Sequence, residues 1–469
     1  MISKKEIKFY SLKDIDSIDF IKPYLSDEDI FELKVVGTIL PFKTNNYIIE
    51  ELIDWTNIPN DPIFQLNFML KEMISEHQFY TIAKLFKSGA SKEEISNSAK
   101  IFRQELNPHP AGQLIANVPI MDSVTVPGIQ HKYDKTALFF PSEGQTCHSY
   151  CTFCFRWAQF VGYHDLKFAT DASKIFLNYL KLHKEISDIL ITGGDPLIMS
   201  LQKLESYILP FLNKEFDHIK NIRIGTKSLS YWPYRFVTDK DANGILQLFE
   251  KVRNSGKQIA FMAHINHYVE LDTEIVKEAV KRLLNVGVTI RTQSPIINHI
   301  NDSADVWAEN WKKQVSLGMF PYYVFIARNT GAKGYFEVPL SRAFEIYSDA
   351  FKKVSGLQRT ARGPVMSANP GKVVINGIST IKGEKVFALN FLQARNPDWV
   401  KHPFFAKYDE TSTWLTQLTP AFGEKKFFYE DELAAILKQK VYEKEKNRKI
   451  IKDNLESKKH NSSLFELCF

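Results

Sequence analysis

Cysteine is scarce in this sequence, and long apolar runs are missing from it. Four of the 469 residues are cysteines, which is too few for a disulfide framework and favours a reducing compartment, the cytoplasm. The longest apolar runs, such as "QIAFMA" at 258–263, are far shorter than the ~20 residues that cross a bilayer, so we expect no membrane segment. The N-terminal "MISKKEIKFY" lacks the apolar core of a signal peptide, so we expect no export.

The sequence also has no large excess of positive or negative charge. The net charge is +6, and no block of the sequence is basic enough to indicate a nucleic-acid partner. Hydrophobic residues make up 44% and charged residues 24%, the ordinary balance of a folded soluble protein. The length suffices for one large core or for two to three domains.

The first part of the chain, residues 1–115, is predicted to be a mostly helical region. Segments such as "DPIFQLNFMLKEMI" and "SKEEISNSAKIFRQEL" have helical patterns, and Ser91 with Glu94 three residues later is typical of a capping box. The segment "NPHPAG" at 107–112 interrupts the pattern. We therefore place a domain boundary near residue 115.

The middle of the chain, residues 116–335, alternates short β-rich runs with helical stretches. Six strands are predicted, at 136–140, 188–192, 221–225, 258–263, 288–292 and 322–326. Helical segments between most of them imply a parallel sheet with right-handed crossovers. The predicted fold class is α/β, a partial (β/α)6 barrel of the TIM type, with a doubly wound sheet as the alternative. In both folds ligands bind at the carboxyl ends of the strands.

The last part of the chain, residues 336–469, is predicted to be a small α+β extension with a helical tail. A helix is followed by the β-rich piece "KVVINGISTIKGEKVFALNF" and then by a polar helical segment. Cys468 in that tail is expected to be a thiol without function.

The other three cysteines, Cys147, Cys151 and Cys154, lie together in the loop after the first predicted strand. A disulfide would leave one thiol unpaired and needs an oxidising compartment. A structural zinc ion needs four ligands, and the candidate fourth, His148, is adjacent to Cys147 and poorly placed. Three thiolates are a soft donor set that suits a [4Fe-4S] cluster with one iron free of protein ligands. We favour the cluster over the disulfide and the zinc site.

The C-x3-C-x2-C spacing on the loop after strand one resembles the radical S-adenosylmethionine (SAM) superfamily. This resemblance implies that the open iron chelates SAM, and that an electron splits SAM into methionine and a 5′-deoxyadenosyl radical that abstracts hydrogen from a C–H bond. The segment "ITGGDPL" at 191–197 resembles the superfamily's GGE/GGD element. Glycines there allow close backbone approach to the methionyl part of SAM. The resemblance thus implies cofactor-binding roles for Gly193, Gly194, Asp195 and Pro196.

Longer segments resemble lysine 2,3-aminomutase and its relatives, over roughly residues 25–400. They include "VPGIQHKYDKTALFF" (126–140), "CHSYCTFCFRWAQFVG" (147–162), "IRIGTKSLSYWPYRF" (222–236), "MAHINHYVE" (262–270) and "TQSPIINHINDS" (292–303). This resemblance implies that Arg156 binds the substrate carboxylate, which a guanidinium grips with two hydrogen bonds. It places Gln293 near SAM and His264 at the edge of the cofactor. It also assigns Lys135, with His131, to the segment that binds the phosphate of pyridoxal 5′-phosphate (PLP).

The sequence departs from the family's pattern in two respects that matter for chemistry. The family's aminomutases hold PLP on a lysine just before "PVM", but "LQRTARGPVM" at 357–366 has Arg362 there, and a guanidinium is a poor nucleophile for an imine. Lysine-specific members present two aspartates to the distal ammonium of their substrate. Arg328 replaces the first, and Arg359 and Arg362 lie where the second is expected. Because arginines repel an ammonium and attract an anion, we expect a small anionic or amino-acid-like substrate and no PLP.

The favoured interpretation is a radical SAM enzyme with Arg156, Arg328 and Arg362 as candidate catalytic residues. The resemblance also implies an external electron donor of the flavodoxin or ferredoxin type and a homodimer. Three alternatives stay open. One is a PLP-dependent 2,3-aminomutase for an acidic or otherwise non-lysine amino acid, with its lysine supplied from elsewhere. Another is a zinc or iron protein without catalysis, and the third is an enzyme that modifies a residue on another protein.

Overall fold

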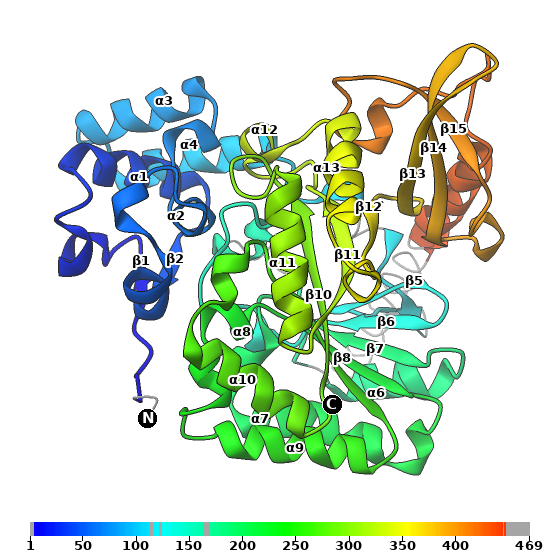
Figure 1. Cartoon of the computed structure of the whole chain (residues 1–469), viewed down its shortest axis with the longest axis horizontal. Coiled ribbons are helices and arrows are strands. Elements are labelled where there is room, and N and C mark those ends of the chain that lie inside the picture. The colour runs from blue at the N-terminus through cyan, green and yellow to red at the C-terminus, as the bar shows by residue number, and fades with distance from the viewer. Residues whose placement is uncertain are drawn as a thin grey trace, which may run out of the picture.

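The computed structural model of the chain describes residues 4–112, 116–121, 124–162, 168–171, 173–443 and 445–446. An eleven-stranded sheet forms its centre. Helices cover the sheet, the N-terminal helices form a layer at one side of it, and a β-hairpin from the C-terminal part projects at the other side (Figure 1). The predicted α/β class is confirmed.

Seven neighbouring strands of this sheet run parallel and follow one another in chain order. They are β6 (Thr136–Phe139), β7 (Asp188–Ile191), β8 (Asn221–Thr226), β9 (Gln258–His264), β10 (Thr289–Ile296), β11 (Phe320–Ile326) and β12 (Arg362–Ser367). The first six match the predicted strands. Their unbroken order confirms the partial barrel against the doubly wound alternative, whose strand order reverses. The seventh, β12, is missing from the prediction because Gly363 and Pro364 disfavour a strand.

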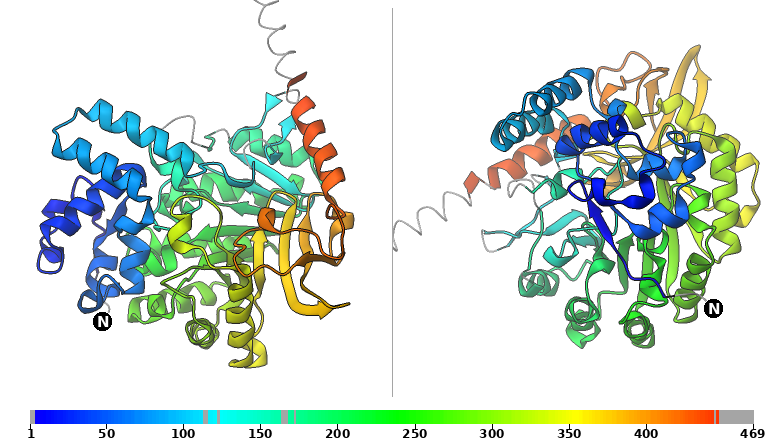
Figure 2. Two further views of the ribbon diagram at one scale, coloured as in Figure 1. Left: turned by 90° about the horizontal axis from the view of Figure 1, so that it is seen from above. Right: turned by 90° about the vertical axis from the view of Figure 1, so that its left-hand side faces the viewer.

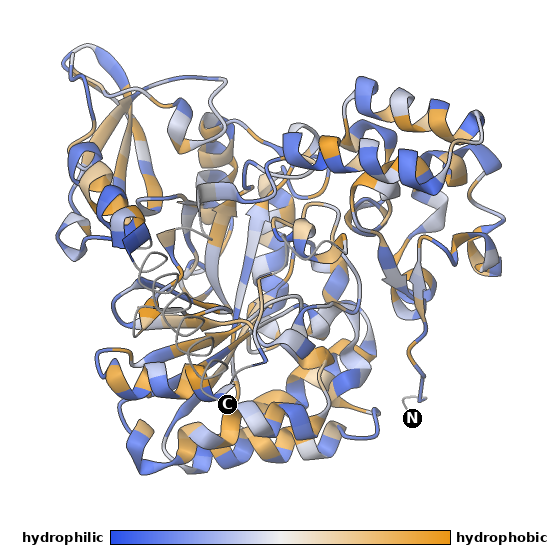
Figure 3. Cartoon of the chain, turned by 180° about the vertical axis from the view of Figure 1, so that it is seen from behind, coloured by the Kyte–Doolittle hydropathy of each residue, from blue (hydrophilic) through white to orange (hydrophobic). Residues whose placement is uncertain are grey.

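Helices connect the parallel strands and cover the sheet from outside. They are α6 (Ser173–Leu182), α7 (Leu201–Ile208), α9 (Ala242–Asn254), α10 (Glu274–Asn285), α11 (Ala304–Ser316) and α13 (Leu340–Lys352). Their buried residues recur every three or four positions, so that each helix has one apolar face; in α10 these residues are Ile275, Val276, Ala279, Val280 and Leu283. The covering helices are accordingly banded orange and blue in Figure 3. Among the described residues, no helix is both long and apolar enough to span a bilayer.

The N-terminal region is mostly helical. It contains β1 (Phe9–Ser11), α1 (Asp27–Ile39), β2 (Lys43–Asn45), α2 (Pro62–Asn67), α3 (Glu76–Lys87) and α4 (Lys92–Glu105). The predicted cap of α4 is confirmed, because the Glu94 amide donates to Ser91 Oγ (3.2 Å) and the Ser91 amide donates to Glu94 Oε2 (2.8 Å). Apolar residues of this region share one core with barrel residues such as Trp157, Tyr231 and Phe336. The region therefore packs directly against the barrel (Figure 2).

The remaining strands extend the sheet at its two edges. At one edge β5 (Ile129–Tyr133) pairs antiparallel with β6. At the other edge, three antiparallel strands continue from β12: β13 (Gly371–Ile381), β14 (Glu384–Ala394) and β15 (Phe404–Lys407). The sheet therefore includes strands from both sides of residue 336, where the predicted C-terminal extension begins. Short elements complete the fold: β3 (Ile120–Met121), β4 (Val124–Thr125), α8 (Ser228–Tyr231) and α12 (Lys333–Phe336). Cys468 lies outside the described residues.

Candidate active site

A cavity of about 460 Å³ lies inside the barrel and carries most of the predicted site residues. It extends along the strands from Asp188, the first residue of β7, to the loops that follow the strands' carboxyl ends. Cys147, Cys151 and Cys154 line it, together with Arg156, Gly193, Gly194, Asp195, His264, Gln293 and Arg328. The cavity therefore includes the carboxyl ends of the parallel strands, where ligands bind in this fold class.

The three cysteines are free thiols that meet in this cavity. Burial raises the pKa of all three thiols, that of Cys151 to about 12. A different cation favours the thiolate at each position: Lys43 acts on Cys147, Lys227 on Cys151 and Arg156 on Cys154. The nearby positive charge favours the thiolate form, which is the form of cysteine that binds metal. In the described part of the chain, no group of three or more His, Cys, Asp or Glu side chains is arranged to hold a single metal ion.

The cysteine loop is fastened to the N-terminal region by hydrogen bonds. The Tyr150 amide donates to the Lys43 carbonyl oxygen (2.9 Å), and the Thr152 amide donates to that of Leu66 (3.0 Å). Ser149 Oγ donates to Asn67 Oδ1 (2.7 Å), and Asn45 Nδ2 donates to the carbonyl oxygens of His148 and Tyr231 (3.0 Å each). Strand β2 and helix α2 therefore hold the loop from the side opposite the barrel.

His148, the fourth ligand in the zinc alternative, has another partner. Its side chain is buried, and its Nδ1 lies 3.1 Å from Ser228 Oγ at the start of α8. Burial, with Arg235 and Lys43 nearby, lowers its pKa to about 3, so the ring is neutral at neutral pH. The ring thus ties the cysteine loop to the segment after β8.

The Gly193–Pro196 segment packs against the residues that precede the first cysteine. The Gly194 amide donates to the Gly144 carbonyl oxygen (3.0 Å), and the Asp195 amide donates to that of Thr146 (2.7 Å). A Cβ atom on Gly194 would lie 2.3 Å from the Thr146 carbonyl oxygen, so only glycine fits there. This contact gives a structural reason for the glycine that is independent of SAM.

Asp195 acts as a brace between two strand-end loops. Its buried carboxylate accepts hydrogen bonds from Thr226 Oγ1 (2.8 Å) and from the amides of Leu197 (3.0 Å) and Lys227 (2.8 Å). Burial raises the pKa of this carboxyl group, and the hydrogen bonds oppose that rise. Pro196, the next residue, is buried and begins a short helix rather than lining the cavity.

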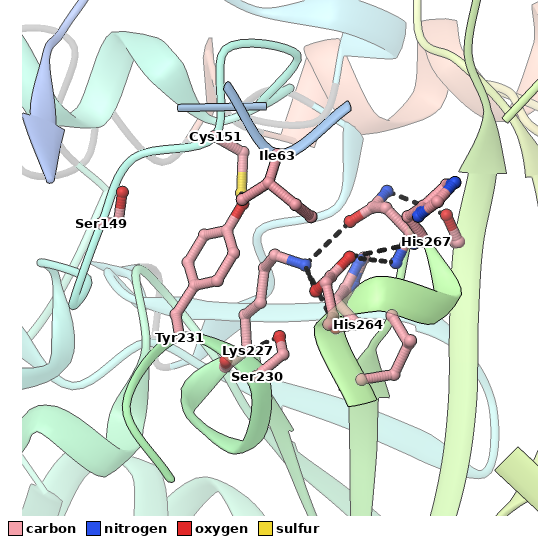
Figure 4. A network of polar contacts seen from close by, with 12 residues as sticks. Ile63, Ser149, Cys151, Lys227, Ser230, Tyr231, His264 and His267 are labelled. Atoms are coloured by element: carbon pink, nitrogen blue, oxygen red, sulfur yellow. Dashed lines mark hydrogen bonds and ion pairs between the residues drawn. The ribbon is translucent and has the colours of Figure 1, made fainter. Parts of the chain in front are cut away.

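A polar network lies beside Cys151 (Figure 4). Lys227 Nζ forms an ion pair with the fully buried Glu270 and donates to Asn266 Oδ1 (2.9 Å). The Tyr231 ring packs 4.3 Å from the same Nζ, and its hydroxyl group lies 3.8 Å from Cys151 Sγ. Lys227 and Tyr231 are missing from the sequence prediction, because the quoted segment 222–236 gives no spacing that distinguishes them.

His264 and Gln293 meet at the ends of two adjacent strands. They are partners in the pairing of β9 with β10, and Gln293 Nε2 lies 2.9 Å from His264 Nε2. Burial lowers the pKa of His264 to about 3, with Lys227 contributing, so the ring is neutral and its Nε2 accepts from the amide. The structure thus brings together two residues that the resemblance assigned to the cofactor.

Arg156 and Arg328 both reach the cavity, and each packs over a phenylalanine. The Arg156 guanidinium lies 4.2 Å from the ring centre of Phe140, and that of Arg328 lies 4.3 Å from Phe155. Arg328 also donates to Ser367 Oγ (3.0 Å), while Arg156 Nε is buried with no hydrogen-bond partner among the described residues. Burial lowers both guanidinium pKa values to about 10, so both side chains stay charged at neutral pH.

The positive charge of the cavity exceeds its negative charge. Two carboxylates line it, Asp188 and Asp195, against six basic side chains: Lys132, Arg156, Arg223, Lys227, Arg328 and Lys372. Arg223 is paired with Asp188 (2.6 Å) and Lys227 with Glu270. The other four have no ion-pair partner in the described part of the chain, so the cavity presents uncompensated positive charge to a ligand.

Comparison with known proteins gives the family. Over 416 residues the chain is 30% identical to a putative L-lysine 2,3-aminomutase of Aquifex aeolicus, an alignment that covers 88% of this chain and 97% of that relative. The chain belongs to the lysine 2,3-aminomutase family. It is also 29% identical over 268 residues to the L-lysine 2,3-aminomutase of Bacillus subtilis, covering 57% of this chain and 54% of that relative. No family model matches the sequence.

Membership of the lysine 2,3-aminomutase family makes the chain an enzyme of the radical SAM type, with isomerase-like activity. A solved radical SAM methyltransferase from Sphaerobacter thermophilus covers 63% of this chain and 95% of its own length, at 11% identity and a TM-score of 0.35. That likeness is too weak to support an argument. The family assignment therefore depends on the sequence relatives.

Three residues singled out by comparison with the lysine 2,3-aminomutase family lie away from the cavity. Lys135 is exposed and pairs with Asp134 (2.7 Å). Arg362, at the position of the family's PLP lysine, is exposed and lies over the rings of Tyr322 and Tyr323 (4.3 Å each). Arg359 donates to the Val354 carbonyl oxygen (2.7 Å). Of the three arginines that led us to expect an anionic substrate, Arg328 alone lines the cavity.

Two lysines that the sequence analysis did not select take their place in the cavity. Lys132 on β5 donates from Nζ to the Ala368 carbonyl oxygen (2.5 Å), and burial lowers its pKa well below the usual value. Lys372 on β13 lines the cavity from the opposite edge of the parallel strands. Lys132 is close in sequence to Lys135, and Lys372 is close to Arg362 but belongs to the next β-rich piece. Both lie on strands whose pairing the sequence alone does not reveal.

Proposed function

We propose that the chain binds a [4Fe-4S] cluster through Cys147, Cys151 and Cys154 and uses SAM for radical chemistry on a small anionic substrate. When bound, the cluster and SAM supply a 5′-deoxyadenosyl radical that takes a hydrogen atom from the substrate. The observation that carries the proposal is that three free thiols line one cavity together with four basic side chains that have no ion-pair partner among the described residues. An external flavodoxin or ferredoxin is the proposed electron source.

The thiols fit a cluster with one open iron. They supply three soft donors, and three protein ligands leave one of four irons free for SAM. Lys43, Lys227 and Arg156 each favour the thiolate form of one cysteine, which offsets the cost of burying negative sulfur. The hydrogen bonds from β2 and α2 fix the loop backbone before any ligand binds.

The proposed SAM-binding residues lie around the thiols. Gly193 and Gly194 line the cavity next to the cysteine loop, and Asp195 holds that segment against β8. His264 and Gln293 present neutral polar groups from the next two strands. Neutral donors and acceptors can bind SAM without adding positive charge beside its sulfonium group.

The proposed substrate site is formed by the basic side chains of the cavity that lack an ion-pair partner among the described residues. Arg156 has a buried Nε without a partner, so a carboxylate can accept from it. Arg328, which stays charged at neutral pH, adds positive charge on the side of β12. A substrate with a distal ammonium group, such as free lysine, would meet these cations and be repelled.

The direct test is anaerobic reconstitution of the full chain with iron and sulfide. We expect about four irons and an electron paramagnetic resonance signal of a reduced [4Fe-4S] cluster, following the three-cysteine chemistry above. With SAM and dithionite the protein should form 5′-deoxyadenosine. Replacing Cys151 with Ala should abolish both properties, whereas Cys468→Ala, the matched control, should keep them. Stoichiometric zinc without sulfide would contradict the proposal.

The substrate class is tested by hydrogen transfer. Deuterated candidates, both anionic metabolites and lysine, are offered to the reconstituted enzyme, and deuterium is measured in 5′-deoxyadenosine. We expect transfer from an anionic compound and none from lysine. Efficient transfer from lysine would contradict the anionic-substrate proposal while leaving the radical chemistry intact.

A further inference from the structure

Lys372 is placed differently from the other lysines that line the cavity. Lys132 Nζ donates to a carbonyl oxygen, and Lys227 Nζ is paired with Glu270. Lys372 Nζ has neither a hydrogen-bond nor an ion-pair partner among the described residues, and it faces the ring of Tyr323 at 4.5 Å. Its amine is therefore both enclosed and free to react.

The charges around Lys372 favour its neutral form. Burial acts first, and Arg223 on β8, Arg362 on β12 and Arg328 after β11 add repulsion. Lys132 on β5 repels it as well. Asp188 on β7 is the opposing charge, and it is itself paired with Arg223. Tyr323 and Tyr133, whose rings flank the amine, have raised pKa values and stay uncharged.

These neighbours lower the pKa of Lys372 to about 7. An ordinary lysine, with a pKa near 10.4, has about one neutral amine in 2,500 at pH 7. About half of the Lys372 amines are neutral at that pH. Lysines that are desolvated and placed beside other cations are the ones that become nucleophiles.

We propose that Lys372 forms an imine with an anionic carbonyl compound bound in the cavity. The neutral nitrogen attacks the carbonyl carbon, both amine protons leave with the carbonyl oxygen as water, and a C=N bond replaces C=O. No oxidant or reductant is needed. The anionic part of the ligand would lie against Arg328 and Lys132, two other basic side chains that line the cavity without an ion-pair partner among the described residues. The proposal depends on the proposed function only for the anionic character of the ligand.

Two kinds of compound share this chemistry, an aldehyde that carries a phosphate and a 2-oxo acid. For the first, Lys372 would provide the amine that Arg362, at the position of the family's PLP lysine, cannot provide. Lys372 lies on the strand next to Arg362, directly opposite Ser367 of β12 in the strand pairing. For the second, the imine would hold the substrate itself. PLP and pyruvate are suitable probes for the two.

The experiment traps the imine on the full chain without cluster or SAM. The protein is incubated at pH 7 with PLP or pyruvate, reduced with borohydride and digested, and the modified lysines are identified by mass spectrometry. We expect Lys372 to be modified at least about tenfold faster than the exposed Lys352, because roughly half of it is neutral. An adduct with PLP alone identifies the phosphate aldehyde, and one with pyruvate alone the 2-oxo acid.

Lys372→Arg provides the matched variant, since it keeps the positive charge but cannot form an imine. It should lose the adduct and retain the circular dichroism spectrum of the folded chain. Equal modification of Lys372 and Lys352 with both probes, or no adduct on Lys372, would overturn the proposal. The adducts are mapped on the chain without any substitution, so this conclusion holds even if the Lys372→Arg variant misfolds. Failure to form 5′-deoxyadenosine would instead count against the proposed radical function and leave the imine result unchanged.

Discussion

The hydroxyl group of Tyr231 lies 3.8 Å from the sulfur of Cys151, and the aromatic ring of Tyr231 covers the ammonium group of Lys227 at 4.3 Å. One side chain therefore touches a proposed cluster ligand and the cation that favours its thiolate form. In the structure the Cys151 thiol donates to this hydroxyl oxygen. A sulfur that binds a cluster carries no proton, so the hydroxyl would then be the donor, and hydrogen bonds to ligand sulfurs stabilise the reduced, more negative state of an iron–sulfur cluster.

Tyr231→Phe should lower the midpoint potential of the reconstituted cluster by tens of millivolts, because it removes that hydrogen bond and keeps the ring. The potential is measured by redox titration followed by electron paramagnetic resonance. Tyr234→Phe is the matched control, since the hydroxyl of Tyr234 donates instead to Glu51 (3.2 Å). Equal potentials in the parent protein and the Tyr231 variant would contradict the assignment of this hydrogen bond.

Gly194→Ala should disturb the cysteine loop without touching a cysteine. The added Cβ would lie within 2.3 to 2.6 Å of the Thr146 backbone, which cannot rotate away as a side chain would. We expect a loss of about 1 to 3 kcal/mol of stability from this overpacking and a lower iron content after reconstitution. Gly334→Ala, where a Cβ meets nothing within 4 Å, should leave both unchanged. Normal iron binding by the Gly194 variant would show that the loop tolerates the shift.

Acid should destabilise the chain through His267. Burial lowers its pKa to about 4, although Glu270 and Asp272 oppose the shift. Between pH 6.5 and about 4 the unfolded chain binds a proton there that the folded chain does not, so the free energy of unfolding falls as the pH falls, by at most about 1.4 kcal/mol per pH unit. His267→Gln should flatten this dependence in urea titrations. An unchanged slope in the His267 variant would refute the prediction.

Asp188→Asn should make Lys372 a nucleophile at lower pH. Asp188 is a negative group that raises the pKa of Lys372, and its loss also frees Arg223 to repel the ammonium more strongly. The midpoint of the pH dependence of imine trapping should therefore move below 7. Glu274→Gln, which removes a surface partner of Lys277, is the control. A midpoint that rises would contradict the charge arrangement described here.

The sequence predicts the regular part of the fold well, because that part is determined by local pattern. The six β-rich runs form parallel strands in the expected order, and the cap formed by Ser91 and Glu94 begins α4. Strand β12 contains Gly363 and Pro364 and is stabilised by its neighbours β11 and β13 rather than by its own propensity. Tertiary pairing of this kind leaves no local signal.

In the candidate site too, local motifs identify some residues, and tertiary pairing determines the others. Contiguous motifs lead to the cysteines and to Gly193 and Gly194, and the structure brings them into one cavity. Lys372 and Lys132 reach that cavity from β13 and β5, and their part in it depends on strand pairing and side-chain direction. Lys135 and Arg362 have matching sequence positions, but Lys135 lies exposed in the turn between β5 and β6, and Arg362 is the exposed first residue of β12.

The contacts between β2, α2 and the cysteine loop have a consequence for assembly. Backbone groups of residues 149–152 find their partners in the first seventy residues of the chain, so an isolated barrel would leave those groups buried without partners or exposed to water. During synthesis the N-terminal segment leaves the ribosome first, so its hydrogen-bonding groups are available when the cysteine loop folds. A chain truncated at the N-terminus would then keep its sheet but would not order the cysteine loop.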